Sequence, residues 1–270
     1  SLCASERKQA DFVTPLFIGA YRGHEEVVTY LCRQDARVSR ELHGGLTPVH
    51  AAVLGGHLGT VSCLGRFGAS LRKTMANGTT LLHASAGNGH AALTRHFCQT
   101  TSDIDEPDPT GWTPLHYASC FAQVQACDCL LRANADMERS TKEGEQPLHV
   151  AIHFGAIAVV EYLCKARANL HCRDKSDLNP VLAAVAEGHV QAVQCLLGAG
   201  APKSSRMSNG MTAIHLAAHA GRVPMLRYLL RIGVDKRVRA LNGSTPLHSA
   251  SGQGHVRAMR VLMDAGLNKD

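Results

Sequence analysis

The sequence predicts an all-α repeat solenoid, in which helix-turn-helix units stack along one axis. Two observations predict it. A phrase related to Thr-Pro-Leu-His recurs every 33 residues, and a glycine stands nine residues after the start of nearly every copy. Such a unit is too short to bury an apolar face alone, so neighbouring units must stack. The composition agrees, because 45% of the 270 residues are hydrophobic and can form an extended core.

The repeat keeps one register along the whole chain, without an insertion or a deletion. We therefore expect a single repeat domain over residues 1–270, with repeats starting near residues 9, 42, 75, 108, 141, 174, 207 and 240. The phrase itself begins at eight positions: Thr14, Thr47, Thr80, Thr113, Gln146, Asn179, Thr212 and Thr245.

Each recurring residue type predicts one part of the unit. Threonine followed by proline suits an N-cap and the first helical position, because the hydroxyl accepts from an orphan amide and proline has no amide to leave unpaired. The glycine nine residues on ends this first helix, since it tolerates a left-handed conformation. A second amphipathic stretch follows, as in residues 189–201. The unit therefore reads turn, helix, turn, helix, loop.

Together the Thr-Pro-Leu-His-x-Ala phrase, the Gly-His ten residues along, the Leu-Leu pair and the Gly-Ala resemble the ankyrin repeat over essentially the whole chain. The resemblance implies a curved stack with short β-hairpin fingers, in which the fingers and first helices line a concave face. Three repeats depart from the pattern, and we expect the first and sixth to be the weakest. The departures are Phe17 and Asp35 in repeat one, Ala122 and Gln123 in repeat four, and Asn179 and Leu182 in repeat six.

Histidines and cysteines first suggest metal or catalytic chemistry, but the repeat accounts for most of them. Eleven of sixteen histidines occupy two repeat positions, and the resemblance implies structural hydrogen bonds for these. The ten cysteines include no CxxC pair, and they are typical of core-filling thiols in a reducing, intracellular or cytoplasmic setting. Only Cys120 lies on the open side of a first helix. We therefore expect no catalytic, metal or cofactor site, and no enzyme.

Aromatic residues gather in two central repeats. Trp112 stands at a fingertip, Tyr117 and Phe121 lie in the same repeat, and Phe154 is the counterpart of Phe121 in the next repeat. Aromatic anchors dominate interface energetics, so we predict a contiguous binding patch here. The alternative is that Trp112 and Tyr117 pack between fingers. The predicted partner-binding residues are Trp112, Tyr117, Phe121, Phe154, His153, Lys142, Glu143 and Glu145.

The charge is unevenly distributed along the chain. Residues 201–270 hold 11 Lys and Arg against 3 Asp and Glu, whereas residues 1–200 carry a net charge of −2. This asymmetry favours a polar partner held in one direction, or an anionic surface met by the basic end. The basic fingers lack interleaved aromatics, which disfavours nucleic acid. The predicted basic patch consists of Lys203, Arg206, Lys236, Arg237 and Arg239.

The sequence thus favours a non-catalytic module that binds a protein or peptide on its concave face, as a scaffold or a targeting element. One alternative is a regulatory or substrate-recruiting array of a larger kinase, ubiquitin ligase, acyltransferase or ion channel. Binding of nucleic acid or an anionic surface by the basic end is a third possibility. No apolar run is long enough to predict a membrane span. The chain starts without Met and residues 255–270 lack a polar cap, so we expect a monomeric piece of a longer array.

Overall fold

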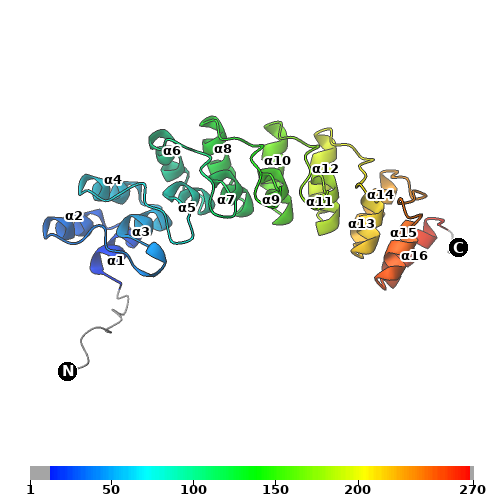
Figure 1. Cartoon of the computed structure of the whole chain (residues 1–270), viewed down its shortest axis with the longest axis horizontal. Coiled ribbons are helices and arrows are strands. Elements are labelled where there is room, and N and C mark those ends of the chain that lie inside the picture. Colours follow the sequence, from blue (N-terminus) through cyan, green and yellow to red (C-terminus); the bar gives the residue numbers. More distant parts are fainter. Residues whose placement is uncertain (1–12, 268–270) are drawn as a thin grey trace, which may run out of the picture. The chain divides into compact units, whose positions relative to one another are not determined.

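The computed structural model describes residues 13–267, so the predicted start of repeat one near residue 9 and the last three residues of the 255–270 stretch lie outside the described residues. The chain divides into two compact units, the first ending at Asp136 and the second beginning at Met137. Within the described residues each unit holds four helix pairs (Figure 1). This confirms the predicted all-α array of helix-turn-helix units.

The first unit contains eight α-helices and one short 3-10 turn, η1, among its described residues. These are α1 (Pro15–Arg22), α2 (Glu25–Arg33), η1 (His43–Gly45), α3 (Pro48–Gly55), α4 (Leu58–Arg66), α5 (Leu81–Gly87), α6 (Ala91–Thr100), α7 (Pro114–Cys120) and α8 (Val124–Arg132). The second unit contains α9 (Pro147–His153), α10 (Ile157–Lys165), α11 (Pro180–Glu187), α12 (Val190–Gly198), α13 (Ala213–His219), α14 (Val223–Arg231), α15 (Pro246–Gly252) and α16 (Val256–Asp264).

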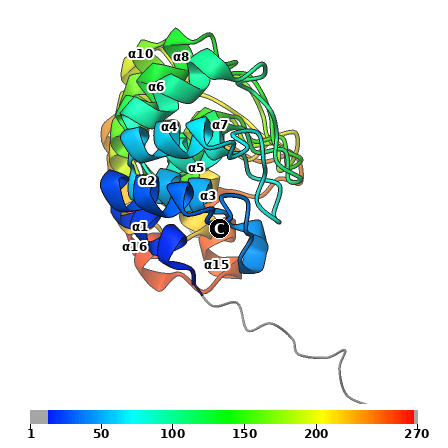
Figure 2. The ribbon, with the colours of Figure 1, turned by 90° about the vertical axis from the view of Figure 1, so that its left-hand side faces the viewer.

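Within each unit the first helices of successive repeats pack on one another, and the second helices form another layer. In the first unit α5 contacts α7 while α6 contacts α8, and in the second α11 contacts α13 while α10 contacts α12. Figure 2 shows the layer of α6 and α8 beside that of α5 and α7. Small and branched apolar side chains fill the space between the layers, as the composition predicts. Fully buried examples are Ala118, Leu130, Val160, Leu196 and Leu226.

The phrase histidines of three repeats join the repeat to the finger of the next. The backbone N–H of Thr80 donates to His83 Nδ1 (3.2 Å), so the proton of this imidazole is on Nε2. His83 Nε2 then donates to the carbonyl of Trp112 (3.0 Å), 29 residues further on. His149 and His215 make the same bond to the next finger in the second unit. The structural role that the resemblance implied for these histidines is confirmed.

Six of the fingers are tight turns in which one backbone N–H is capped by a side chain. The capped N–H belongs to the residue just before the phrase, and the acceptor takes one of two forms. In three fingers the acceptor is the side chain of the first finger residue, which is Asp108, Thr141 or Asp174. In three others it is the side chain of the third finger residue, which is Asn77, Asn209 or Asn242. The fingers contain almost no β-structure, since the only β-bridge among residues 13–267 joins Arg206 to Thr212.

Repeat four departs from the pattern at Ala122, which has φ 58° where the other repeats place glycine. A Cβ atom in the left-handed region costs roughly 1–2 kcal/mol, so the irregularity expected for this repeat is a local backbone strain. Asp35 in repeat one is similarly left-handed, at φ 57°.

Repeat six keeps an N-cap although it lacks the usual threonine. The Asn179 side-chain oxygen accepts from the backbone N–H of Leu182 (2.9 Å), and its Nδ2 donates to Ser205 Oγ (2.7 Å). Leu182 is completely buried in the place of the usual histidine. Asn179 therefore caps the helix in place of threonine, and Leu182 packs in the core in place of histidine.

Restoring the common residues at this site should consequently destabilise the protein. We expect Asn179→Thr with Leu182→His to lower the free energy of unfolding by about 2 kcal/mol, because it removes the bond that Asn179 Nδ2 donates to Ser205 Oγ and places a polar imidazole in an apolar site. Denaturant unfolding of the double variant and of Asn179→Thr alone measures the two contributions. A higher unfolding midpoint for the double variant would contradict this reading of the repeat.

Candidate functional site

In each unit the fingers and the C-terminal ends of the first helices form a surface that we call the finger surface. All the predicted partner-binding residues belong to these fingers and helices. Trp112, Tyr117 and Phe121 lie in the first unit, and His153 and Phe154 lie in the second.

Trp112 and Tyr117 form a packed aromatic cluster in the first unit. Their rings meet edge to face with centroids 5.6 Å apart, and Tyr117 also meets His83 at 5.1 Å. Both side chains are half-buried. The backbone of Trp112 accepts from His83, as described above. The structure therefore favours the alternative interpretation for these two residues, in which they pack between neighbouring fingers.

Asp108 holds this cluster in place, and the sequence interpretation missed it. Its buried carboxylate accepts from Tyr117 Oη (3.0 Å), from the Trp112 N–H (2.9 Å) and from both the N–H and the hydroxyl of Thr110. Burial opposes ionisation, but these hydrogen bonds outweigh it and hold the pKa of Asp108 below its usual value. Burial and the bond to Asp108 raise the pKa of Tyr117. An aspartate at the first finger position, nine residues before a tyrosine, was the available signal.

Phe121 lies beside this cluster but stays open to solvent. Its side chain is 57% exposed at the end of α7. A Cβ atom placed on Gly87 would lie 3.3 Å from Phe121 Cδ2 and 3.4 Å from Tyr117 Cδ1. The absence of a side chain on Gly87 of α5 therefore leaves room for the phenyl ring, which stays largely exposed.

Phe154 occupies the equivalent place in the second unit, next to charged residues. It is 52% exposed and meets the His153 ring at 5.1 Å. His153 Nδ1 lies 3.1 Å from Glu187 Oε1. Burial raises the pKa of Glu145, and three surrounding carboxylates, those of Asp174, Glu143 and Glu187, raise it further while His153 opposes them. The surface around Phe154 is therefore acidic. Glu187 contributes to this charge, although it was not among the residues predicted from the sequence.

The remaining predicted residues of this site are exposed on the same finger. Lys142 and Glu143 are both exposed, and the Glu143 N–H donates to Thr141 Oγ1 (3.2 Å). Because Trp112 and Phe121 belong to one unit and Phe154 to the other, the contiguous patch of all three stays a prediction.

Three members of the predicted basic patch have structural partners, and one of these is Arg239, whose Nη1 donates to the carbonyl of Gly243 (3.0 Å) in the same finger. Lys203 Nζ donates to the carbonyl of Ile232 (3.0 Å) at the end of α14, and Lys236 Nζ donates to that of Ala265 at the end of α16. A cation at a helix C-terminus stabilises it through the helix dipole. Arg206, Arg237 and Arg239 are exposed on the fingers.

Several of the described cysteines are weaker acids than an ordinary thiol. Burial raises the pKa of Cys98 and Cys164 to about 11 and that of Cys127 to about 12. Burial also raises the pKa of Cys120, the thiol on the open side of α7. Among residues 13–267 no three His, Cys, Asp or Glu side chains are placed to hold a metal ion. In the same range, every helix is too short or too polar to span a membrane.

A model of the ankyrin repeat family, built on three copies, matches residues 62–141, 94–174, 121–206 and 181–270. The chain belongs to the ankyrin repeat family. Among solved structures, it is similar to the crystal structure of the human ASB11 ankyrin repeat domain, with 22% sequence identity and a TM-score of 0.71. That likeness covers 82% of this chain and 99% of the other, and it shows the fold. No curated protein matches the chain.

These findings confirm the resemblance drawn from the 33-residue register. Ankyrin repeats are generally protein–protein interaction modules, and their fold is generally non-enzymatic.

Proposed function

We propose that this ankyrin array is a non-catalytic module that binds a peptide or a domain of a partner protein on its finger surface. In a larger assembly it would act as a scaffold or a targeting element. The observation that carries the proposal is the pair of solvent-facing phenylalanines, Phe121 and Phe154, at the same repeat position of adjacent repeats.

Leaving the apolar rings of Phe121 and Phe154 exposed to water is unfavourable. The chain contains six phenylalanines in all, so exposing two of them on the finger surface is not a consequence of aromatic-rich composition. Each ring is supported from behind, Phe121 by Gly87 and Phe154 by His153, and each keeps about half of its surface open. Exposed aromatics on a rigid support are typical binding anchors, since they desolvate on contact with little loss of side-chain entropy.

We expect the double variant Phe121→Ala, Phe154→Ala to lose partner affinity by about thirtyfold, which corresponds to roughly 2 kcal/mol for a truncated anchor. Quantitative affinity capture from cell extract, followed by titration of the captured protein, measures the loss. The fold should be unaffected, because neither ring is part of the core.

Tyr30 supplies the matched control. Its side chain is 65% exposed, but it lies on the second helix α2, away from the finger surface. Tyr30→Ala should bind the same partners as the unmodified protein. If the phenylalanine variant retains every partner at full affinity, or if Tyr30→Ala loses them equally, the finger surface is not the binding surface.

A further inference from the structure

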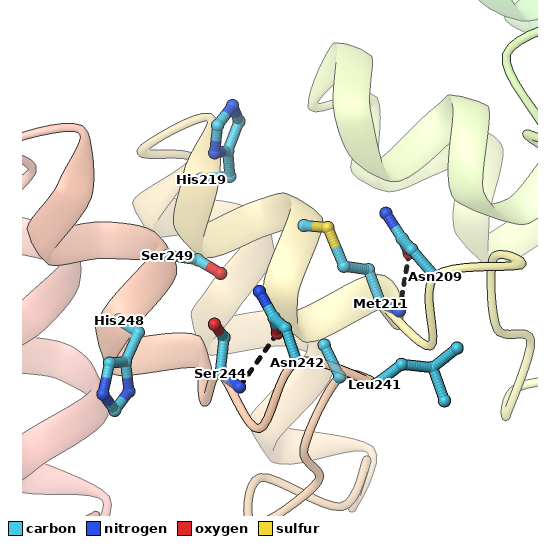
Figure 3. A pocket seen from close by; sticks show the side chains of 9 residues that line it. Asn209, Met211, His219, Leu241, Asn242, Ser244, His248 and Ser249 are labelled. Carbon is cyan, nitrogen blue, oxygen red and sulfur yellow. Dashed lines mark hydrogen bonds between the residues drawn. The ribbon is translucent and has the colours of Figure 1, made fainter.

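A pocket opens on the finger surface of the second unit, between the fingers of its last two repeats (Figure 3). It has a volume of about 400 Å³, which accommodates one or two side chains of a bound peptide. The fingers contribute Asn209, Met211, Leu241, Asn242 and Ser244 to its lining, and α13 and α15 contribute His219, His248 and Ser249.

Two asparagines direct hydrogen-bond donors from the fingers. Asn209 Oδ1 accepts from the N–H of Met211 (2.9 Å), and Asn242 Oδ1 accepts from the N–H of Ser244 (3.0 Å). These bonds use the oxygen of each carboxamide and fix the orientation of its NH2 group. Neither NH2 group donates to another residue among those that the structure describes, so both can serve a ligand.

A further donor comes from α15. The N–H of Thr245 donates to His248 Nδ1 (3.3 Å), which leaves the proton of this imidazole on Nε2. In His83, His149 and His215 the Nε2 proton is used by the carbonyl of the next finger. The Nε2 of His248 has no such acceptor within residues 13–267, and the side chain is exposed.

No charged side chain lines the pocket, and the charged residues nearest to it along its two fingers are arginines. The exposed Arg206 and Arg239 immediately precede the two fingers that bound it, and residues 201–270 carry a net charge of +8. Apolar surface is present as well, because Leu241 is 80% exposed and Met211 lines the same wall. Oriented donors in a positive field suit carboxylates and carbonyl oxygens, and the two apolar side chains suit an aliphatic neighbour.

We propose that this pocket binds an acidic, extended peptide segment of a partner protein. An Asp or Glu carboxylate of the peptide accepts from the NH2 groups of Asn209 and Asn242, and an adjacent aliphatic side chain contacts Leu241 and Met211. The inference rests on the proposed function and names the chemistry of the partner. It assigns to the second unit an anchor site separate from the ring of Phe154.

A displayed library of random short peptides, selected against the protein, tests the proposal. The selected peptides should be enriched in Asp and Glu beside aliphatic residues, and their affinity should fall as salt is added. The variant Asn209→Asp, Asn242→Asp keeps the oxygen that caps each finger but replaces both donors with negative charge. We expect it to bind a selected acidic peptide about tenfold more weakly, or worse, because like charges then face each other.

Asn77→Asp is the matched control. Asn77 caps its finger in the first unit in the same way, with Oδ1 accepting from the N–H of Thr79 (3.2 Å). This variant should bind the selected peptide like the unmodified protein. The proposal is overturned if no peptide is enriched, if the enriched peptides are neutral or basic, or if the double variant binds them equally well. Partners that are lost with Phe121→Ala, Phe154→Ala but kept by the asparagine variants would leave the proposed function intact and exclude this pocket.

Discussion

The protein should lose stability steeply as the pH falls below about 6.5, because both units bury neutral histidines. His50 and His83 in the first unit and His149 and His215 in the second are at most 2% exposed. Burial lowers the pKa of all four from the ordinary value of 6.5, and the hydrogen bonds to backbone carbonyls only partly offset it. Below about pH 6.5 the unfolded chain therefore binds more protons than the folded chain does.

The geometry explains why protonation is costly. In His50, for example, Nδ1 lies 3.2 Å from the backbone N of Thr47, which must donate to it, and Nε2 donates to the carbonyl of Lys73 (3.1 Å). A second proton on Nδ1 would face the N–H of Thr47 directly. The imidazolium would also be buried with no carboxylate hydrogen-bonded to it, which is unfavourable in a medium of low polarity.

The sign and size follow from proton linkage. Each folded-state pKa lies below the unfolded one, so the contribution of these histidines is complete above pH 6.5 and is lost as the pH falls towards the folded values. Between those two pKa values each histidine lowers the free energy of unfolding by about 1.4 kcal/mol for each pH unit that the pH falls. Four of them give a slope in the free energy of unfolding of up to about 5.5 kcal/mol per pH unit, shared between the two units.

Denaturant unfolding at pH 7.5, 6.5 and 5.5 measures this slope above the range in which most carboxylates titrate. The chain provides its own control, since repeat six uses the pair Asn179 and Leu182 in place of threonine and histidine. Transplanting that pair as Thr212→Asn with His215→Leu should flatten the slope by one histidine's share, whatever it does to stability at pH 7.5. A free energy of unfolding that stays constant between pH 6.5 and 5.5 would show that these imidazoles remain accessible to protons.

The repeat architecture could be predicted from sequence because it depends on spacing. Thr113, Pro114 and His116 specify a cap, a helix start and a bond to the next finger without reference to any other part of the chain, and the same spacing occurs in all eight repeats. Repeat six shows that a different residue can provide the same cap. A cap needs an oxygen at the right place, and Asn179 supplies one as well as threonine does.

The candidate site was less predictable because exposure depends on what the neighbouring repeat places behind a side chain. Trp112 and Phe121 both looked like anchors, yet Tyr117 and the carboxylate of Asp108 draw Trp112 into a packed cluster, whereas Gly87 leaves Phe121 lying open. Likewise, the lysines Lys203 and Lys236 appear in the sequence as free charges. Only the structure shows that each reaches a helix end 29 residues away.

Replacement of Asp108 by alanine should destabilise the first unit by about 3 kcal/mol. One carboxylate accepts the N–H groups of Thr110 and Trp112 and the hydroxyl of Tyr117, and its removal leaves these donors unsatisfied in a site that is 8% exposed. Each buried donor without a partner costs roughly 1–3 kcal/mol, although water entering the emptied site will recover part of this. Since the pKa of Asp108 is lowered, its contribution is present above the ordinary value of 3.8 and is lost only as the pH falls below it.

Trp112 is the only tryptophan in the chain, so its fluorescence reports on the cluster directly. Asp108→Ala should shift the emission of the folded protein to longer wavelength, because the indole loses its hold on Tyr117 and meets more water. Asp174→Ala is the matched control, since Asp174 occupies the same finger position in the second unit and caps the N–H of Leu178 (2.8 Å). It should cost less stability and leave the tryptophan emission unchanged. If Asp108→Ala unfolds at the same denaturant concentration as the unmodified protein and its emission does not move, the cluster is held by ring packing alone, and Trp112 becomes available again as a binding residue beside Phe121.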